Sequence, residues 1–134
     1  MILWWNLTSI ITSGTLFGTR FTGSLSYDST GMTGVGVEYL GLKTITFSFA
    51  GVAWSKMQLY QGGEVVLRDG YPWYWTGAFL PPQGSLVTVL AIGFGGSGVI
   101  GYETPGGVFG MGDCHMVPTL WSYLWLLVWR IFHK

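Results

Sequence analysis

The residues best suited to nucleophilic chemistry in this chain of 134 residues are three neighbours, Asp113, Cys114 and His115. A cysteine nucleophile needs a histidine within hydrogen-bond reach and a third group that orients the histidine. Consecutive side chains of an extended segment point to opposite sides, so we expect these neighbours not to meet. The chain has one cysteine and only one further histidine, His133, so a zinc site lacks its usual ligands. We therefore expect no metal and no cofactor.

The six acidic residues are the other groups that could act as general acid or base. Four of them, Glu38, Glu64, Asp69 and Glu103, could supply a carboxylate pair for hydrolysis if two of them lay within about 10 Å of each other in a cleft. Asp28 and Asp69 stand in turn contexts, where an aspartate side chain bonds nearby backbone N–H groups. We expect solvated turn positions and no enzyme, with a hydrolase as the third hypothesis for function.

Residues 71–75 read Tyr-Pro-Trp-Tyr-Trp and form the most aromatic stretch before the C-terminus. In a regular strand, Tyr71, Trp73 and Trp75 would share one face and form a flat aromatic strip. Such a strip stacks on sugar rings or is buried against a partner, whereas the alternative places it in the core between two sheets. A carbohydrate- or matrix-binding module is therefore the second hypothesis for function.

A separate helix is expected over residues 117–134, after a domain that spans residues 1–116. Pro118 and Thr119 are typical of a helix start, and Arg130 and the basic end favour a helix C-terminus. Its uncharged run of about 11 residues would be roughly 16 Å long, against about 30 Å for the hydrocarbon core of a bilayer. The helix either packs against the domain or a partner subunit, or lies at a membrane with its tryptophans at the interface.

Tryptophan recurs at every fourth position of this helix, which places the three rings in a slowly drifting line along one face. Leucine and isoleucine side chains cover the opposite side, so the helix is apolar all round. The residues expected to contact a membrane or a partner are Trp121, Trp125, Trp129, Leu124 and Arg130.

The rest of the chain is typical of an all-β protein. Apolar residues alternate with polar ones in short runs, and glycine and proline separate the runs. Gly62-Gly63 and Asp69-Gly70 indicate tight hairpin turns. We predict an antiparallel β-sandwich or barrel of about eight strands. The nine extended runs that supply them lie at residues 4–12, 17–27, 43–49, 52–60, 64–68, 71–79, 85–94, 98–103 and 107–113.

Composition excludes several classes of protein. Hydrophobic residues make up 49% of the chain and charged residues only 9%, which excludes intrinsic disorder. The 22 glycines follow no three-residue period, so the chain is glycine-rich without being collagen-like. Six basic and six acidic residues give net charge zero, so no nucleic-acid partner is expected. Little charge repulsion keeps copies apart, so association with a protein partner or with itself is expected.

Three segments carry a family resemblance: residues 18–28 (GTRFTGSLSYD), 32–38 (MTGVGVE) and 42–51 (LKTITFSFAG). Over residues 14–51 the chain resembles the small β-sandwich exoproteins, frequent in cyanobacteria, that carry a PEP-CTERM sorting tail. The order of Val117-Pro118, an apolar helix and Arg130 is similar to that tail, although its Pro-Glu-Pro motif is absent. The resemblance implies a β-sandwich and an extracellular or cell-surface location, and it implies no reaction.

The first hypothesis for function is a non-enzymatic structural or accessory protein that is membrane-associated or displayed at the cell surface. It would assemble with partners or with itself through its C-terminal helix and aromatic strands. Neutral net charge, apolar chain ends and the lack of a catalytic constellation in the sequence favour this hypothesis.

Overall fold

The structure is a computed structural model that describes residues 1–93 and 98–132. Its elements in chain order are β1 (Ile2–Ile11), β2 (Arg20–Asp28), the 3-10 turn η1 (Ser29–Gly31), β3 (Val37–Phe49), β4 (Val52–Ser55), the 3-10 turn η2 (Lys56–Gln58), β5 (Leu59–Arg68), β6 (Tyr71–Phe79), β7 (Val89–Ile92), β8 (Val99–Thr104), β9 (Val108–Pro118) and the helix α1 (Leu120–Phe132). The predicted strand over 85–94 is shorter, and its last residue, Phe94, lies outside the described residues, as do residues 133–134.

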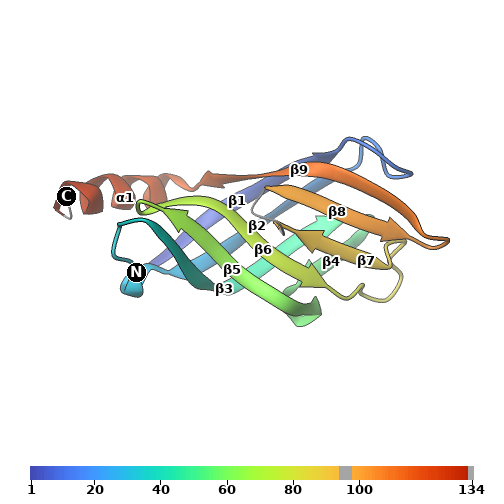
Figure 1. The fold of residues 1–134 in the computed structure, drawn as a ribbon, viewed down its shortest axis with the longest axis horizontal. Helices are drawn as coiled ribbons and strands as arrows, with labels where there is room; N and C mark the ends of the chain where they lie inside the picture. Colours follow the sequence, from blue (N-terminus) through green and yellow to red (C-terminus); the bar gives the residue numbers. More distant parts are fainter. Residues whose placement is uncertain (94–97, 133–134) are drawn as a thin grey trace.

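Eight of the strands form one closed antiparallel barrel (Figure 1). The order around the barrel is β1, β9, β8, β7, β6, β5, β3 and β2, and pairing between β2 and β1 closes the ring. The expected all-β antiparallel fold with a C-terminal apolar helix is confirmed, and of the two architectures left open the strands adopt the barrel. Closure leaves no sheet edge within the ring, which removes the unpaired N–H and C=O groups of an open sheet.

The ninth strand, β4, lies outside this ring and pairs only with β3. It turns back from β3 at Ala50-Gly51, where both residues have positive φ (53° and 77°), as the common two-residue hairpins require. β4 contributes Trp54 to the core, where the ring is 1% exposed, stacks on Phe47 and donates its N–H to the Phe49 carbonyl at 3.0 Å. The extra strand therefore completes the core.

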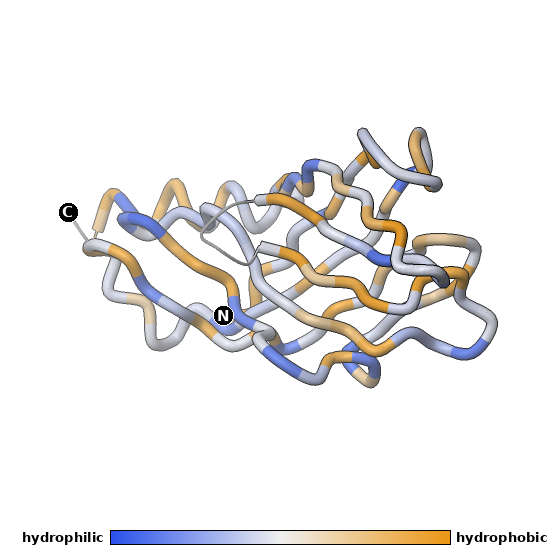
Figure 2. The backbone as a smooth tube through the Cα atoms, turned by 45° about the vertical axis from the view of Figure 1, so that its right-hand side comes forward, coloured by the Kyte–Doolittle hydropathy of each residue, from blue (hydrophilic) through white to orange (hydrophobic). Residues whose placement is uncertain are grey.

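Alternation of side chains fills the barrel interior. In β1 every second residue from Leu3 to Ile11 is buried and the residues between them are exposed, as expected for a strand with one face in a core. The same alternation of hydrophobic and hydrophilic residues is visible along other strands (Figure 2). Aromatic rings dominate the interior, and Phe47 lies at their centre, stacked on Phe21 at 4.3 Å and edge-on to Phe79 at 5.2 Å.

One predicted turn is wrong. Gly62 and Gly63 do not form a hairpin but lie inside β5, where both have positive φ and the pairing with β6 shifts register. The reason is that a glycine pair with positive φ also suits a β-bulge, which adds a residue to a strand without reversing the chain. The Asp69-Gly70 turn between β5 and β6 is present, with φ of 51° and 82°.

Candidate interaction surface

Helix α1 follows β9 directly and projects at one end of the barrel (Figure 1). Thr119 caps it, because its Oγ1 accepts a hydrogen bond from the Ser122 N–H at 3.4 Å and its carbonyl accepts one from Tyr123 at 3.0 Å. The Ser122 hydroxyl accepts the backbone N–H of Trp4 at 2.8 Å. The first turn of the helix is thereby tied to β1.

The inner face of α1 consists of Ser122, Trp125, Leu126 and Trp129, which recur at the spacing of one helical face. Leu126 is 2% exposed and belongs to the barrel core. Trp125 and Trp129 are half-buried and stack on each other at 6.3 Å. The inner face therefore docks the helix onto the end of the barrel.

A shelf of two glycines receives the Trp129 ring. A Cβ atom on Gly34 would collide with this indole, and one on Gly70 would touch it. Gly34 belongs to the loop before β3, and hydrogen bonds from its N–H and from Thr33 to the Glu38 carboxylate hold that loop. Burial of this carboxylate opposes ionisation, but the hydrogen bonds outweigh it and lower the pKa of Glu38. The shelf is therefore built by turn residues far apart in the sequence.

The outer face of α1 is almost entirely apolar and faces away from the barrel. Only Arg130 carries a charge among the exposed residues of the helix. Large exposed apolar surfaces are uncommon on monomeric proteins and usually mark a binding surface. The exposed apolar residues that make up this outer face are Leu120, Trp121, Tyr123, Leu124, Leu127, Val128, Ile131 and Phe132.

The structure divides the residues that the sequence analysis assigned to one binding set. Trp121 is 76% exposed, and Leu124 and Arg130 are also exposed, so these three lie on the accessible side of α1. Trp125 and Trp129 face the barrel instead. Two of the three tryptophans, Trp125 and Trp129, therefore serve docking within the chain, and Trp121 lies on the side left open. No helix in the described ranges 1–93 and 98–132 has both the length and the apolar character needed to cross a membrane.

The expected aromatic strip on β6 is not formed. The register with β5 shifts at Trp73, because Leu67 pairs with Pro72 whereas Val66 pairs with Tyr74. The extra residue reverses the alternation, so Trp73 is 52% exposed while Trp75 is 1% exposed and points into the core. Only Tyr71 and Trp73 remain accessible, and the Arg68 guanidinium lies 5.6 Å from the centre of the Trp73 ring.

The neighbours Asp113, Cys114 and His115 lie in β9 with their side chains on alternate faces. Cys114 is buried in the barrel, whereas Asp113 and His115 are exposed outside it. Burial raises the pKa of the Cys114 thiol to about 11, so the thiol is protonated at neutral pH. Among the described residues, no three side chains of the metal-binding types gather into a group that could hold an ion.

Asp69 and Asp28 bind backbone groups of turns and loops. Asp69 accepts the N–H of Gly36 at 2.9 Å. Asp28 accepts the hydroxyl and the N–H of Thr30, and these bonds, aided by the N-terminal ammonium group at 3.4 Å, lower its pKa to about 2. Both aspartates thus have the backbone partners expected of turn residues.

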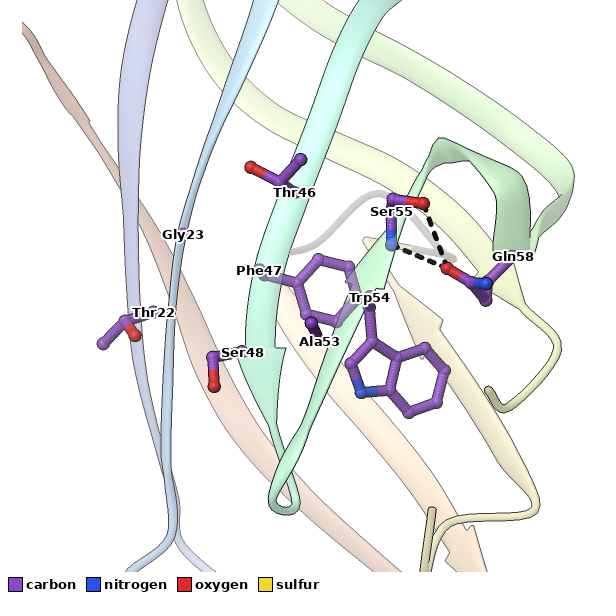
Figure 3. Close-up of a pocket in the computed structure, with 9 residues that line it drawn as sticks. All are labelled: Thr22, Gly23, Thr46, Phe47, Ser48, Ala53, Trp54, Ser55 and Gln58. Carbon is purple, nitrogen blue, oxygen red and sulfur yellow. Dashed lines mark hydrogen bonds between the residues drawn. The ribbon is translucent and has the colours of Figure 1, made fainter. Parts of the chain in front are cut away.

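A hollow of about 490 Å³ lies over β2, β3 and β4 (Figure 3). Its accessible side chains are hydroxyls and the amide of Gln58, whose Oε1 accepts bonds from the N–H and hydroxyl of Ser55. The two rings at this site, Phe47 and Trp54, are buried and stack on each other. The hollow therefore has no charged lining residue and no exposed ring on which a sugar could stack.

A second hollow, which the sequence analysis missed, lies on the outside of β7, β8 and β9 and has a volume of about 300 Å³. Gly101 forms its floor between Ala91 and Met111, and Glu103 lies between Val89 and Phe109. We call these six residues the β8 groove. The alternating Phe109 and Met111 of the last predicted strand were the only indication of it in the sequence.

Comparisons of the chain with protein-family models, with curated proteins and with solved structures find no match.

Proposed function

We propose that this protein is a non-enzymatic structural protein that assembles with further copies of itself through the outer face of α1. The observation that carries the proposal is the exposure of eight apolar side chains on a helix of 13 residues. The inner face already docks the helix, so the outer face has no structural role within the chain. Full burial of a large aliphatic or aromatic side chain contributes about 1.5–3 kcal/mol, so covering several half-exposed ones supports a stable contact.

The net charge of the chain supports a second copy as the partner that covers the outer face of α1. The formal net charge is zero, so copies do not repel one another at neutral pH. Three of the described groups that could do chemistry are engaged within the chain: Glu38 and Asp69 accept backbone N–H groups of a loop, and Cys114 is buried, which favours a role without catalysis. The cell-surface location that follows from the family resemblance stays a prediction.

The test is sedimentation velocity of the full chain over a wide range of concentration. We expect wild-type protein to form larger species as its concentration rises. Replacement of Leu124 and Leu127 by glutamate should leave a monomer, because glutamate suits a helix but its charge opposes burial in an interface. The matched control replaces Met57 and Tyr60, two exposed apolar residues remote from α1, by glutamate and should assemble like wild type.

Vesicles of phosphatidylcholine and phosphatidylglycerol provide the opposing outcome. A chain that stays monomeric in solution but floats with vesicles through Leu124 and Leu127 would show that lipid covers the outer face, and the proposal of self-assembly would be wrong. A wild-type chain that is monomeric at every concentration and does not float with vesicles would also overturn the proposal of self-assembly.

A further inference from the structure

We infer that the β8 groove is the surface that receives α1 of a second copy of this chain, an inference that rests on the proposed function. Apart from Glu103, the residues of the groove are apolar, as are those of the outer face of α1. Val89, Phe109 and Met111 are all exposed around the hollow, as are the leucines of the helix. A volume of about 300 Å³ accommodates side chains such as Leu127 and Ile131 from a helix laid across the strands.

The charges of the two surfaces are complementary. Residues 85–112 contain a single charged residue, Glu103, which lies in the groove. Residues 114–134 contain no acidic residue, and Arg130 is exposed beside the outer face of α1. A pair between Glu103 of one copy and Arg130 of the next would orient the helix in the groove, since rim charges contribute more to register than to affinity.

Helix α1 lies at one end of the molecule and the turn between β8 and β9 at the other (Figure 1). α1 projects beyond the end of β9, whereas the β8 groove adjoins the turn between β8 and β9 at the other end. Two different patches that bind each other form a heterologous contact, which joins copies head to tail into a ring where the rotation closes and into an open filament where it does not. The inference is thus head-to-tail assembly.

Gly101 offers a way to fill the groove without disturbing the barrel. A Cβ atom at this position would meet nothing within 4 Å, and the backbone does not have the positive φ that excludes other residues. Gly101→Val should therefore fold normally and raise the concentration needed for half-assembly by about tenfold or more, a loss of roughly 1.4 kcal/mol in contact energy. Gly41→Val in β3, where a Cβ atom is equally free, is the matched control and should assemble like wild type.

Charge reversal tests the pairing. Glu103→Arg and Arg130→Glu should each weaken assembly, because each brings two like charges together. An equimolar mixture of the two variants should assemble, since every contact between unlike copies then joins opposite charges. The double variant Glu103→Arg/Arg130→Glu should also assemble alone.

The outcomes separate the groove from the proposed function. If wild type assembles through Leu124 and Leu127 but Gly101→Val assembles equally well, the groove is the wrong partner and the proposed function stands. A discrete dimer of wild type, or a mixture of charge variants that stays monomeric, would overturn head-to-tail docking. Wild type that never assembles would overturn both.

Discussion

Single residues at the end of the barrel determine whether α1 docks. Gly34 and Gly70 leave room for the Trp129 ring, and the ring in turn holds the half-buried Trp125. Glu38 and Asp69 fix the loop that contains Gly34 and Gly36 through hydrogen bonds to backbone N–H groups. Docking of the helix therefore depends on two glycines, Gly34 and Gly70, whose role is to leave space for the Trp129 ring.

A pair of glycine variants separates this contact from backbone strain. Gly34 and Gly36 both have positive φ, 82° and 67°, but only Gly34 lies under Trp129. Both alanine variants carry the strain of positive φ, and Gly34→Ala must also displace the indole. We expect Gly34→Ala to lower the free energy of unfolding by about 1–3 kcal/mol more than Gly36→Ala. Urea unfolding monitored by tryptophan fluorescence measures both, and equal losses would show that Trp129 does not rest on Gly34.

At the scale of the elements, a β-bulge in β6 decides which aromatic residues of the strand face solvent and which face the core. The register shift at Trp73 turns Trp75 inward, where it meets Phe79 edge-on at 6.1 Å. The alternation expected from residues 71–75 holds only up to Trp73. A bulge follows from how two strands pair, so the sequence of one strand does not show it.

The two tryptophans of β6 should therefore differ sharply in their contribution to stability. Trp75→Ala removes a buried ring and should lower the free energy of unfolding by about 3–5 kcal/mol. Trp73→Ala removes an exposed ring with one cation–π contact and should cost less than about 1 kcal/mol. Denaturant unfolding of both variants checks this difference. Small and similar losses of unfolding free energy in both variants would show that Trp75 lies on the exposed face with Trp73, as the sequence predicted.

The whole molecule protects its interior by closing the sheet on itself. Cys114 lies on the inner side of β9, paired with Ser9 of β1 on one side and donating its N–H to the Gly98 carbonyl at 2.7 Å on the other, and it is 7% exposed. Its raised pKa follows from that burial and adds to the steric protection.

Reactivity of Cys114 therefore reports opening of the barrel. At pH 8 the native protein should react with a disulfide reagent such as dithionitrobenzoate far more slowly than the urea-unfolded chain, in which the thiol regains its ordinary pKa. The rate of the reaction, measured by absorbance, should rise toward that of the unfolded chain as the urea concentration approaches the unfolding midpoint. A native thiol that reacts as fast as the unfolded one would mean that Cys114 is not buried in the native barrel.

Local patterns in the chain were sufficient to predict the class of fold. Alternation in segments such as residues 20–28 and the glycine turns indicated antiparallel strands, and the run after Pro118 indicated a terminal apolar helix, because these features depend on near neighbours in the sequence.

Four features depend instead on contacts between distant segments: the closed barrel, the inward Trp75, the docking of Trp129 and the β8 groove. Their physical cause is the pairing of β2 with β3 and of β1 with β9, which bends the sheet into a ring and brings loops at residues 33–36 and 69–70 beneath the helix. A helix that is apolar all round could dock on either face, and the glycine shelf under Trp129 selects the face that carries Trp125, Leu126 and Trp129.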